Sequence, residues 1–181
     1  SELEEIRERV KRVEEELRKN LKDAERRVRE AKRRSEESLK DIEKKVKEVR
    51  DELKELARRG ADRKDIRRIV KEIEKRIRDA AKRNEDIVRR VEEEIKRLVE
   101  SNRTLADDIS RRVKELLDRV TDGSAREDIK RLLKELEELL KRSEDEARRL
   151  LKEVRDLVDT TKKRIDKLLK EIEDLLREIE R

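Results

Sequence analysis

The sequence predicts an all-α protein, an antiparallel up-down-up three-helix bundle of long, coiled-coil-like helices. Charged residues make up 60% of the 181 residues and aromatic residues are absent, a composition typical of long helices and coiled coils. Apolar residues recur every three or four positions along almost the whole chain, which is the spacing of one helix face. Gly60 and Gly123 are the only glycines, and they divide this pattern into three similar stretches. We therefore expect a single three-helix domain over residues 1–181.

The first helix is expected at about residues 2–59. Its apolar and small residues form a narrow stripe from Leu3 to Leu56. The stripe repeats about every 3.5 residues, which indicates a mild left-handed supercoil. Arg58 and Arg59 close the helix, where positive charge is favoured. Gly60 follows them and can adopt the left-handed conformation that ends a helix.

The second helix is expected at about residues 62–121. Asp62 lies just before the periodic pattern resumes and can cap its N-terminus. Pairs of adjacent apolar residues, such as Ile69 and Val70, widen the stripe. A helix that contacts two neighbours needs this extra width.

The third helix is expected at about residues 124–180. Ser124 with Glu127 three positions later is the pattern of a capping box. The stripe is again widened by pairs such as Leu132 and Leu133. Both connecting loops are only a few residues long, which favours antiparallel neighbours.

Asn84 interrupts the apolar stripe of the second helix. It follows Ile77 and Ala80 and precedes Ile87, at a position where the next apolar residue is expected. A buried amide without hydrogen-bond partners costs roughly 1–3 kcal/mol. We therefore expect partners for Asn84 on the other two helices.

Folding the chain at its two loops predicts which residues of the three helices lie at the same position along the bundle axis, which we call the same height. Asn84 then lies opposite positions 37 and 161, and Asn102 lies opposite positions 19 and 143. Uncharged polar residues gather at both heights. The layer of Asn84 also contains Ser35, Ser38, Thr160 and Thr161. The layer of Asn102 also contains Asn20, Ser101, Thr104 and Ser143.

These two layers are interpreted as a structural polar network. Amides and hydroxyls both donate and accept hydrogen bonds, so a ring of them can satisfy itself in a dry core. Such layers contribute helix register and specificity more than stability. Replacing Asn84 alone with Leu is expected to leave its partner side chains without a hydrogen bond. The alternative is that the Ser and Thr residues lie on the helix surface and bond to their own backbone.

No catalytic, metal-binding or cofactor-binding residues are predicted. A serine nucleophile needs an activating base, and the chain has no His and no Lys on the apolar stripe. Without His or Cys, the usual zinc and di-iron ligand sets cannot form. The protein is therefore not expected to be an enzyme.

No nucleic-acid or membrane partner is predicted either. The net charge is +6, but 57 basic and 51 acidic residues are interspersed, and there is no aromatic residue to stack on a base. No apolar run approaches the length of a membrane span, and no face carries Trp or Phe anchors. We find no targeting signal, so the sequence leaves the localisation open. Ser1 in first position suggests a processed or recombinant N-terminus, and a soluble product of cytoplasmic expression is expected.

The whole chain resembles computationally designed, parametrically generated helical bundles with buried hydrogen-bond networks. The resemblance rests on the Glu/Lys/Arg surface, the aliphatic core, the equal helices, the short Gly loops and the layered Asn, Ser and Thr residues. Natural three-helix families such as spectrin-like repeats usually have core aromatics, which this chain lacks. The resemblance implies high stability and no enzymatic activity.

Two functions are compatible with this pattern. The first is a monomeric structural scaffold whose polar layers set helix register and which requires no partner. The alternative is a binding module or oligomer component that offers an apolar groove to an engineered helix or to a second copy. The wide Leu-rich stripe of residues 124–180 motivates this alternative. A continuous exposed apolar patch along that helix would favour it.

Overall fold

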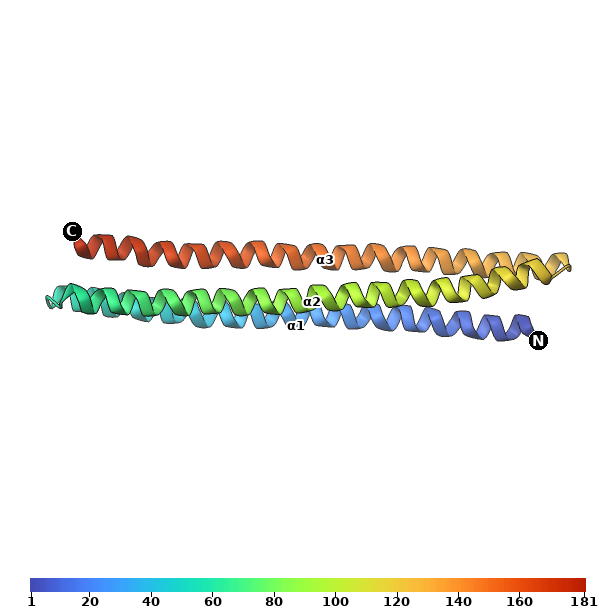
Figure 1. Ribbon diagram of the computed structural model, residues 1–181, viewed down its shortest axis with the longest axis horizontal. Coiled ribbons are helices and arrows are strands. Elements are labelled where there is room, and N and C mark those ends of the chain that lie inside the picture. Colours follow the sequence, from blue (N-terminus) through green and yellow to red (C-terminus); the bar gives the residue numbers. More distant parts are fainter. The chain divides into compact units, whose positions relative to one another are not determined.

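The computed structural model describes residues 1–181 and consists of three α-helices (Figure 1). Helix α1 spans Glu2–Arg58, α2 spans Arg63–Arg119 and α3 spans Gly123–Glu180. Their bounds lie within two residues of the predicted ones, and no residue is in a strand. The predicted all-α, three-helix fold is therefore confirmed.

Contacts along the chain divide it into two compact units. Unit 1 comprises Ser1–Val28 and Val91–Glu153, and unit 2 comprises Arg29–Arg90 and Val154–Arg181. Each unit thus contains one segment of every helix. The single domain expected over residues 1–181 stays a prediction, and the units are described separately below.

The core of unit 2 is aliphatic. Its buried side chains come from all three helices, and burial of each large aliphatic side chain contributes about 1.5–3 kcal/mol. The largest fully buried side chains of this unit are Leu39, Val46, Leu53, Ile73, Ile77 and Ile172.

The core of unit 1 follows the same rule. One cluster of buried aliphatic residues again draws on all three helices and is flanked by half-buried leucines on α3. Its members are Val10, Ile109, Val113, Leu116, Ile129 and Leu136. The apolar periodicity of the sequence therefore faces inward in both units.

Cross-helix contacts give the helix directions within each unit. In unit 1, residue numbers increase along α1 while those of the paired residues on α2 decrease. Glu2 pairs with Arg119 (3.5 Å), and Arg27 pairs with Glu94 (2.7 Å). In unit 2, the residue numbers of the paired residues increase together along α1 and α3. The pairs that show this are Arg164 with Glu36 and Arg50 with Glu171. In unit 1, α1 and α2 therefore run in opposite directions, and in unit 2, α1 and α3 run in the same direction.

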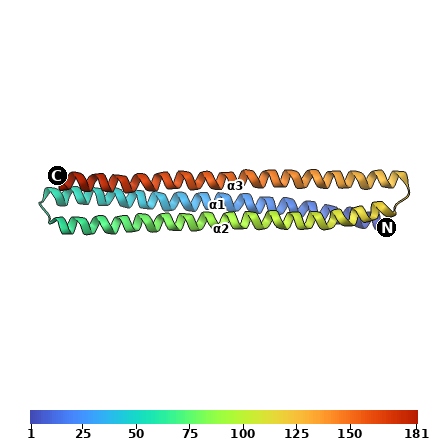
Figure 2. The same ribbon diagram turned by 45° about the horizontal axis from the view of Figure 1, so that its top comes forward.

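Gly60 forms the turn between α1 and α2 (Figure 2). Its φ of 76° is the left-handed conformation. The Ala61 amide donates to the Leu56 carbonyl (3.0 Å) and the Gly60 amide to the Ala57 carbonyl (3.1 Å), the two bonds of a Schellman motif. Asp62 then caps α2 by accepting a bond from the Lys64 amide at 3.2 Å, as predicted.

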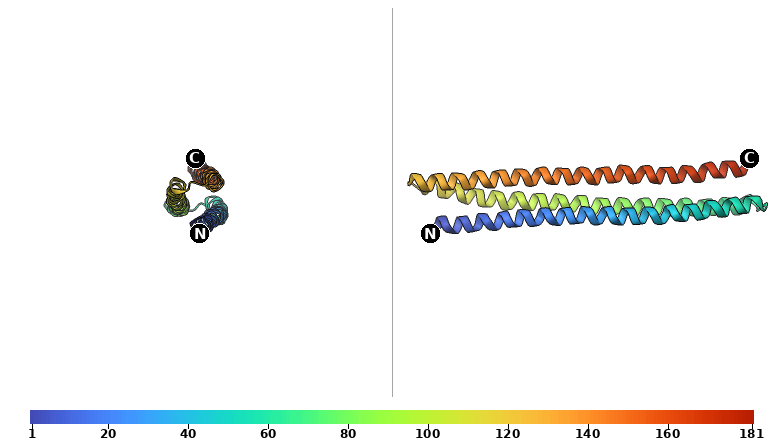
Figure 3. Two further views of the ribbon diagram at one scale, coloured as in Figure 1. Left: turned by 90° about the vertical axis from the view of Figure 1, so that its right-hand side faces the viewer. Right: turned by 180° about the vertical axis from the view of Figure 1, so that it is seen from behind.

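The turn between α2 and α3 (Figure 3) has a different N-cap residue from the predicted one. Helix α3 begins at Gly123, so Asp122 and not Ser124 occupies the N-cap position. The Asp122 carboxylate accepts a bond from the Ala125 amide at 3.3 Å. The predicted Ser124 capping box is therefore wrong. The Arg126 side chain also donates to the Leu117 carbonyl (2.7 Å) and the Val120 carbonyl (2.9 Å), which covers the C-terminal end of α2.

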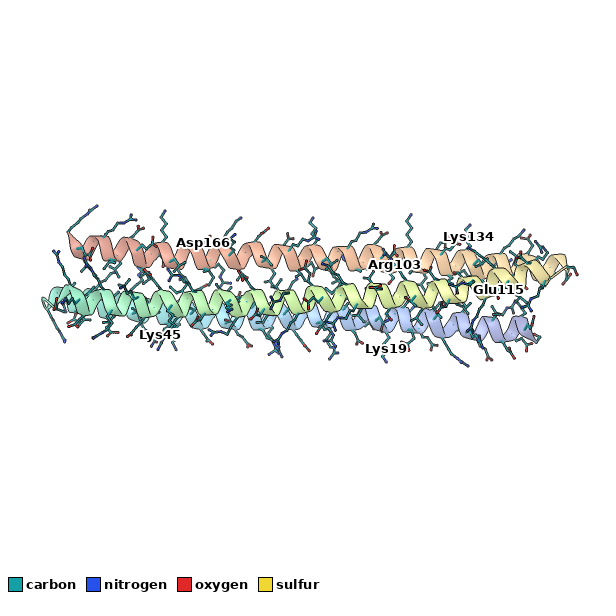
Figure 4. All side chains as sticks on the ribbon, viewed as in Figure 1. Lys19, Lys45, Arg103, Glu115, Lys134 and Asp166 are labelled. Carbon is teal, nitrogen blue, oxygen red and sulfur yellow. The ribbon has the colours of Figure 1, made fainter.

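Charged side chains cover the outer faces of the helices (Figure 4). The labelled residues Lys19, Lys45, Glu115 and Lys134 are all exposed. Many of the ion pairs join residues three or four positions apart on one helix and remain solvated. Such pairs each contribute little to stability, so the positioning of the helices comes from the core.

Candidate functional site

Asn102 lies at the centre of a buried polar contact in unit 1. Its side chain is 5% exposed and lies on α2 between Asn20 of α1 and Ser143 of α3. The Asn20 Nδ2 donates to Asn102 Oδ1 at 2.7 Å. The Asn102 Nδ2 donates to Ser143 Oγ at 3.0 Å. One amide therefore links all three helices of this unit.

The chemistry of this arrangement suits an amide. A primary amide carries both an acceptor oxygen and a donor nitrogen, so Asn102 can accept from one neighbour and donate to the other. Ser143 is buried and Asn20 is half-buried. A bonded polar group avoids most of the cost of burial without partners. We name Asn20, Asn102 and Ser143 the Asn102 triad.

Ser101 and Thr104 lie outside this triad. Both are exposed, although the sequence places them at the same height as Asn102. The physical reason is helix rotation, because successive side chains turn by about 100° around the axis. Ser101 is one position before Asn102 and Thr104 is two positions after it. Both side chains therefore face solvent while Asn102 faces the core.

Ser35 and Thr161 form the corresponding contact in unit 2. Ser35 is 0% exposed and Thr161 is 6% exposed. Their hydroxyl oxygens lie 3.3 Å apart, within hydrogen-bond distance, and either hydroxyl can donate. This contact joins α1 to α3 through the core. We name it the Ser35–Thr161 pair.

Asn84 does not join this pair. Its side chain is 2% exposed, yet neither its amide nitrogen nor its amide oxygen has a hydrogen-bond partner. The expectation that Asn84 has partners on both other helices is therefore wrong. Two buried, unpaired amide atoms cost roughly 1–3 kcal/mol each.

Ser38 and Thr160, the other two residues predicted for this layer, are also not buried beside Asn84. Thr160 is exposed, because it lies one position before the buried Thr161. Ser38 is half-buried and lines a groove between α1 and α2 together with charged residues such as Arg34 and Asp79. Ser38 and Thr160 therefore occupy the predicted positions along their helices, but their side chains lie outside the buried core.

Arg164 forms an ion-pair cluster between α3 and α1 in unit 2. Its guanidinium bonds both oxygens of Glu36, at 2.5 and 3.3 Å, and also bonds Glu43 at 2.8 Å. The hydrogen bond from Arg164 lowers the pKa of Glu36, and the hydrogen bond to Glu36 raises the pKa of Arg164. Arg164 is three residues after Thr161 and Glu36 is next to Ser35, so the cluster flanks the Ser35–Thr161 pair.

Arg103 and Glu144 form a similar contact in unit 1. Each is the residue directly after a member of the Asn102 triad, and the guanidinium Nε donates to the carboxylate at 2.8 Å. This bond raises the pKa of Arg103. The Arg103 side chain is 57% exposed, so solvent screens the pair and its contribution to stability is small.

The sequence reasoning did not identify these two ion-pair contacts. The signal was present in the spacing of Glu36 and Glu43, seven residues apart on one face of α1, with Arg164 at the matching height on α3. With 60% charged residues, however, many such matches occur, and only side-chain positions distinguish the pairs that form.

Neither a metal site nor a membrane span is found in the chain. No group of three or more Asp, Glu, His or Cys side chains is arranged to hold a metal ion. None of the three helices combines the length and the apolar run required to cross a bilayer.

A solved structure described as "Computationally designed three helix bundle" is 20% identical in sequence, with a TM-score of 0.36, over 99% of this chain and 87% of that chain. No family model and no curated protein matches the chain. A TM-score of 0.36 is too low to indicate a shared fold, so the fold and site rest on the chain's own contacts.

Proposed function

We propose that the protein is a designed structural scaffold whose buried Asn, Ser and Thr residues fix the alignment of the helices. The observation that supports this proposal is the Asn102 triad. Asn102 accepts from Asn20 at 2.7 Å and donates to Ser143 at 3.0 Å. In this proposal the chain is monomeric, requires no cofactor and forms one antiparallel bundle.

The physical reason lies in what aliphatic cores leave undetermined. Layers of Leu, Ile and Val pack almost equally well after a helix rotates or slides by a repeat. A buried amide penalises those shifts, because each shift leaves its donor and acceptor unpaired in the core. Asn102 makes bonds to two helices, so one residue constrains both interfaces of α2.

The alternative of a binding module requires an exposed apolar face on α3. No large hydrophobic side chain is exposed in this chain. The half-buried leucines of α3 pack against the core instead, as Leu132 and Leu133 do in unit 1 and Leu169 and Leu176 do in unit 2. This burial supports the scaffold over a module that recruits a further helix.

Spin-label distance measurements test the proposed role. The chain contains no cysteine, so an introduced pair can be labelled uniquely. Lys19→Cys on α1 and Lys134→Cys on α3 suit this purpose, because both positions are exposed in unit 1. Sliding by one seven-residue repeat would move a label by about 10 Å along the helix.

The comparison is between the labelled parent and a variant that replaces the triad with Asn20→Leu, Asn102→Leu and Ser143→Ala. We expect one narrow distance distribution in the parent and a broadened or split distribution in the triad variant, with helicity retained. The control variant is Ser101→Ala with Thr104→Ala, which removes exposed polar groups at the same height. Identical distributions in all three proteins would contradict the proposed role.

Light scattering at micromolar concentration tests the monomer separately. A mass of about one chain, 22.0 kDa, is expected for the parent. The triad variant is expected to show additional, larger species, since an aliphatic layer no longer penalises wrong partners. A parent that forms only dimers or trimers would show that the monomer proposal is wrong, whatever the spin labels report.

A further inference from the structure

The excess positive charge of the chain is concentrated in unit 2. This unit contains 32 Lys and Arg residues and 24 Asp and Glu residues, whereas unit 1 contains 25 and 27. Counting charges helix by helix hides this difference, because each helix contributes one segment to each unit. An excess of basic residues on one part of a protein is the electrostatic feature that attracts polyanions.

Within unit 2 the excess lies on α1 and α2. Residues 29–90, which include both helix segments and the turn between them, contain 24 basic and 16 acidic residues. Residues 154–181, the α3 segment, contain eight of each. A groove of about 550 Å³ lies between the α1 and α2 segments. We name the exposed surface of residues 29–90 around this groove the basic face.

Three exposed arginines line the groove of the basic face, namely Arg34 on α1 and Arg76 and Arg83 on α2. None of the three forms an ion pair, although many arginines of this chain pair with an acid three or four positions away. A guanidinium carries five N–H donors and binds phosphate oxygens well. Those of the three groove arginines are therefore available to an anion from solution.

The groove also contains three carboxylates. Glu37 is ion-paired with Arg33 at 3.5 Å, so part of its charge is compensated. Asp41 and Asp79 are exposed and form no ion pair. These two aspartates lower the positive potential of the groove locally, and they give the test of its charge described below.

We propose that the basic face binds the phosphate backbone of double-stranded nucleic acid without reading its sequence. Lys and Arg side chains that neutralise phosphates release counterions, and this release supplies sequence-independent binding. Arg76 and Arg83 are seven residues apart, about 10 Å along α2, so each can contact a different phosphate. The sequence-based expectation of no nucleic-acid partner took the charges of the whole chain together.

A duplex fits the basic face better than a single strand or a membrane does. Single-strand sites stack bases on aromatic side chains, and this chain has none. In a duplex the bases are already stacked, and the backbone alone offers its phosphates. Proteins that lie on a membrane bury apolar side chains in the headgroup boundary, and no large hydrophobic side chain is exposed here.

Fluorescence anisotropy of a short labelled DNA duplex, measured with the full chain over a series of salt concentrations, tests the proposal. The logarithm of the affinity should fall linearly with the logarithm of the salt concentration, by about 0.9 per phosphate contacted. The site variant combines Arg34→Gln, Arg76→Gln and Arg83→Gln. We expect it to make the slope shallower by about 2.7 and to weaken binding at least tenfold at about 50 mM salt. A duplex of unrelated sequence should bind the parent equally well.

The matched control removes the same charge from unit 1. It combines Arg12→Gln, Arg112→Gln and Arg142→Gln, three arginines that are also exposed and also form no ion pair. Charges outside the contacted face are largely screened by salt, so we expect affinity within about twofold of the parent. Circular dichroism establishes that both variants are folded.

Asp41→Asn combined with Asp79→Asn makes the opposite change. It removes two negative charges from the groove and leaves its arginines in place. The phosphates then meet less repulsion, and we expect binding at least about threefold tighter than in the parent. Unchanged or weaker binding would show that the phosphates do not approach this groove.

Three further results would overturn the proposal. One is an equal loss of affinity in the site variant and the unit 1 control, which would show that only the net charge matters. Another is no binding of the duplex by the parent at about 50 mM salt. The third is binding to phosphatidylserine-containing vesicles without binding to the duplex, which would assign the basic face to a membrane surface. None of these results affects the scaffold proposal, which rests on the Asn102 triad in unit 1.

Discussion

Asn102 of α2 donates a hydrogen bond to Ser143 of α3, with 3.0 Å between Nδ2 and Oγ. Asn84 lies on the same helix, is also buried, and makes no hydrogen bond with either amide atom. The two residues therefore provide an internal comparison. The same side chain in the same kind of core is expected to stabilise alignment at one position and to reduce stability at the other.

Asn84→Leu is expected to raise the free energy of unfolding by about 1 kcal/mol or more, because it removes unpaired buried polar atoms. Asn102→Leu is the matched control, and it is expected to lower that free energy because it leaves Asn20 and Ser143 without their partner. Guanidinium denaturation of both variants measures the difference. A loss of stability in Asn84→Leu would show that its amide is paired in solution.

The Ser35–Thr161 pair is expected to behave as a unit. Ser35→Ala alone leaves the Thr161 hydroxyl unpaired in the core and should cost about 1–3 kcal/mol. The double variant Ser35→Ala with Thr161→Val removes both hydroxyls and should be close to neutral or stabilising. Denaturation midpoints of the two variants give the comparison. If the second substitution makes the first one worse, the 3.3 Å contact is not a hydrogen bond in solution.

The two glycines are expected to respond differently to alanine. Gly60 has a φ of 76°, a conformation that costs an alanine roughly 1–2 kcal/mol. Gly123 has no such φ, begins α3, and leaves open space around an added Cβ. Gly60→Ala should therefore lower stability by about that amount, while Gly123→Ala should be neutral or slightly stabilising. Equal effects in denaturant titrations would contradict the assigned turn geometry.

The Arg164 cluster predicts a pH dependence. The hydrogen bond from Arg164 lowers the pKa of Glu36 in the folded protein. Its contribution to stability is therefore present above the ordinary pKa of a glutamate, and it is lost as the pH falls through the lowered value. The effect is small because the Glu36 side chain is 47% exposed.

NMR titration of the Glu36 carboxyl measures this shift directly. In Arg164→Met, which keeps an apolar stem but removes the charge, the pKa of Glu36 should rise toward its ordinary range. The difference in unfolding free energy between parent and variant should shrink as the pH falls. An unchanged Glu36 pKa in Arg164→Met would contradict the cluster.

The sequence was sufficient to predict the helices because their signals are local and repeated. Apolar spacing defined each helix, and Gly60 and Asp62 marked one boundary through backbone and capping chemistry. At the second boundary the predicted Ser124 capping box was wrong, because Asp122 can also cap a helix and residue spacing does not rank the two. Only the position of the first helical residue, Gly123, distinguishes them.

The candidate site was harder to predict, because the position of a residue along the helix axis does not determine on which side of the helix its side chain lies. Counting from the loops placed Asn20, Asn102 and Ser143 together, and they are hydrogen bonded. The same counting included Ser101 and Thr160, which are exposed. Whether a buried Asn finds partners depends on side-chain reach and rotamer, and spacing alone does not determine these for Asn84.

A double-mutant cycle on Asn102 and Ser143 tests the central claim most directly. The unfolding free energies of the parent, Asn102→Ala, Ser143→Ala and the double variant give the coupling energy between the two side chains. We predict a favourable coupling of about 0.5–3 kcal/mol, as found for residues in one hydrogen-bond network. Additive effects, with a coupling below about 0.3 kcal/mol, would contradict a buried hydrogen bond that holds α2 and α3 in alignment.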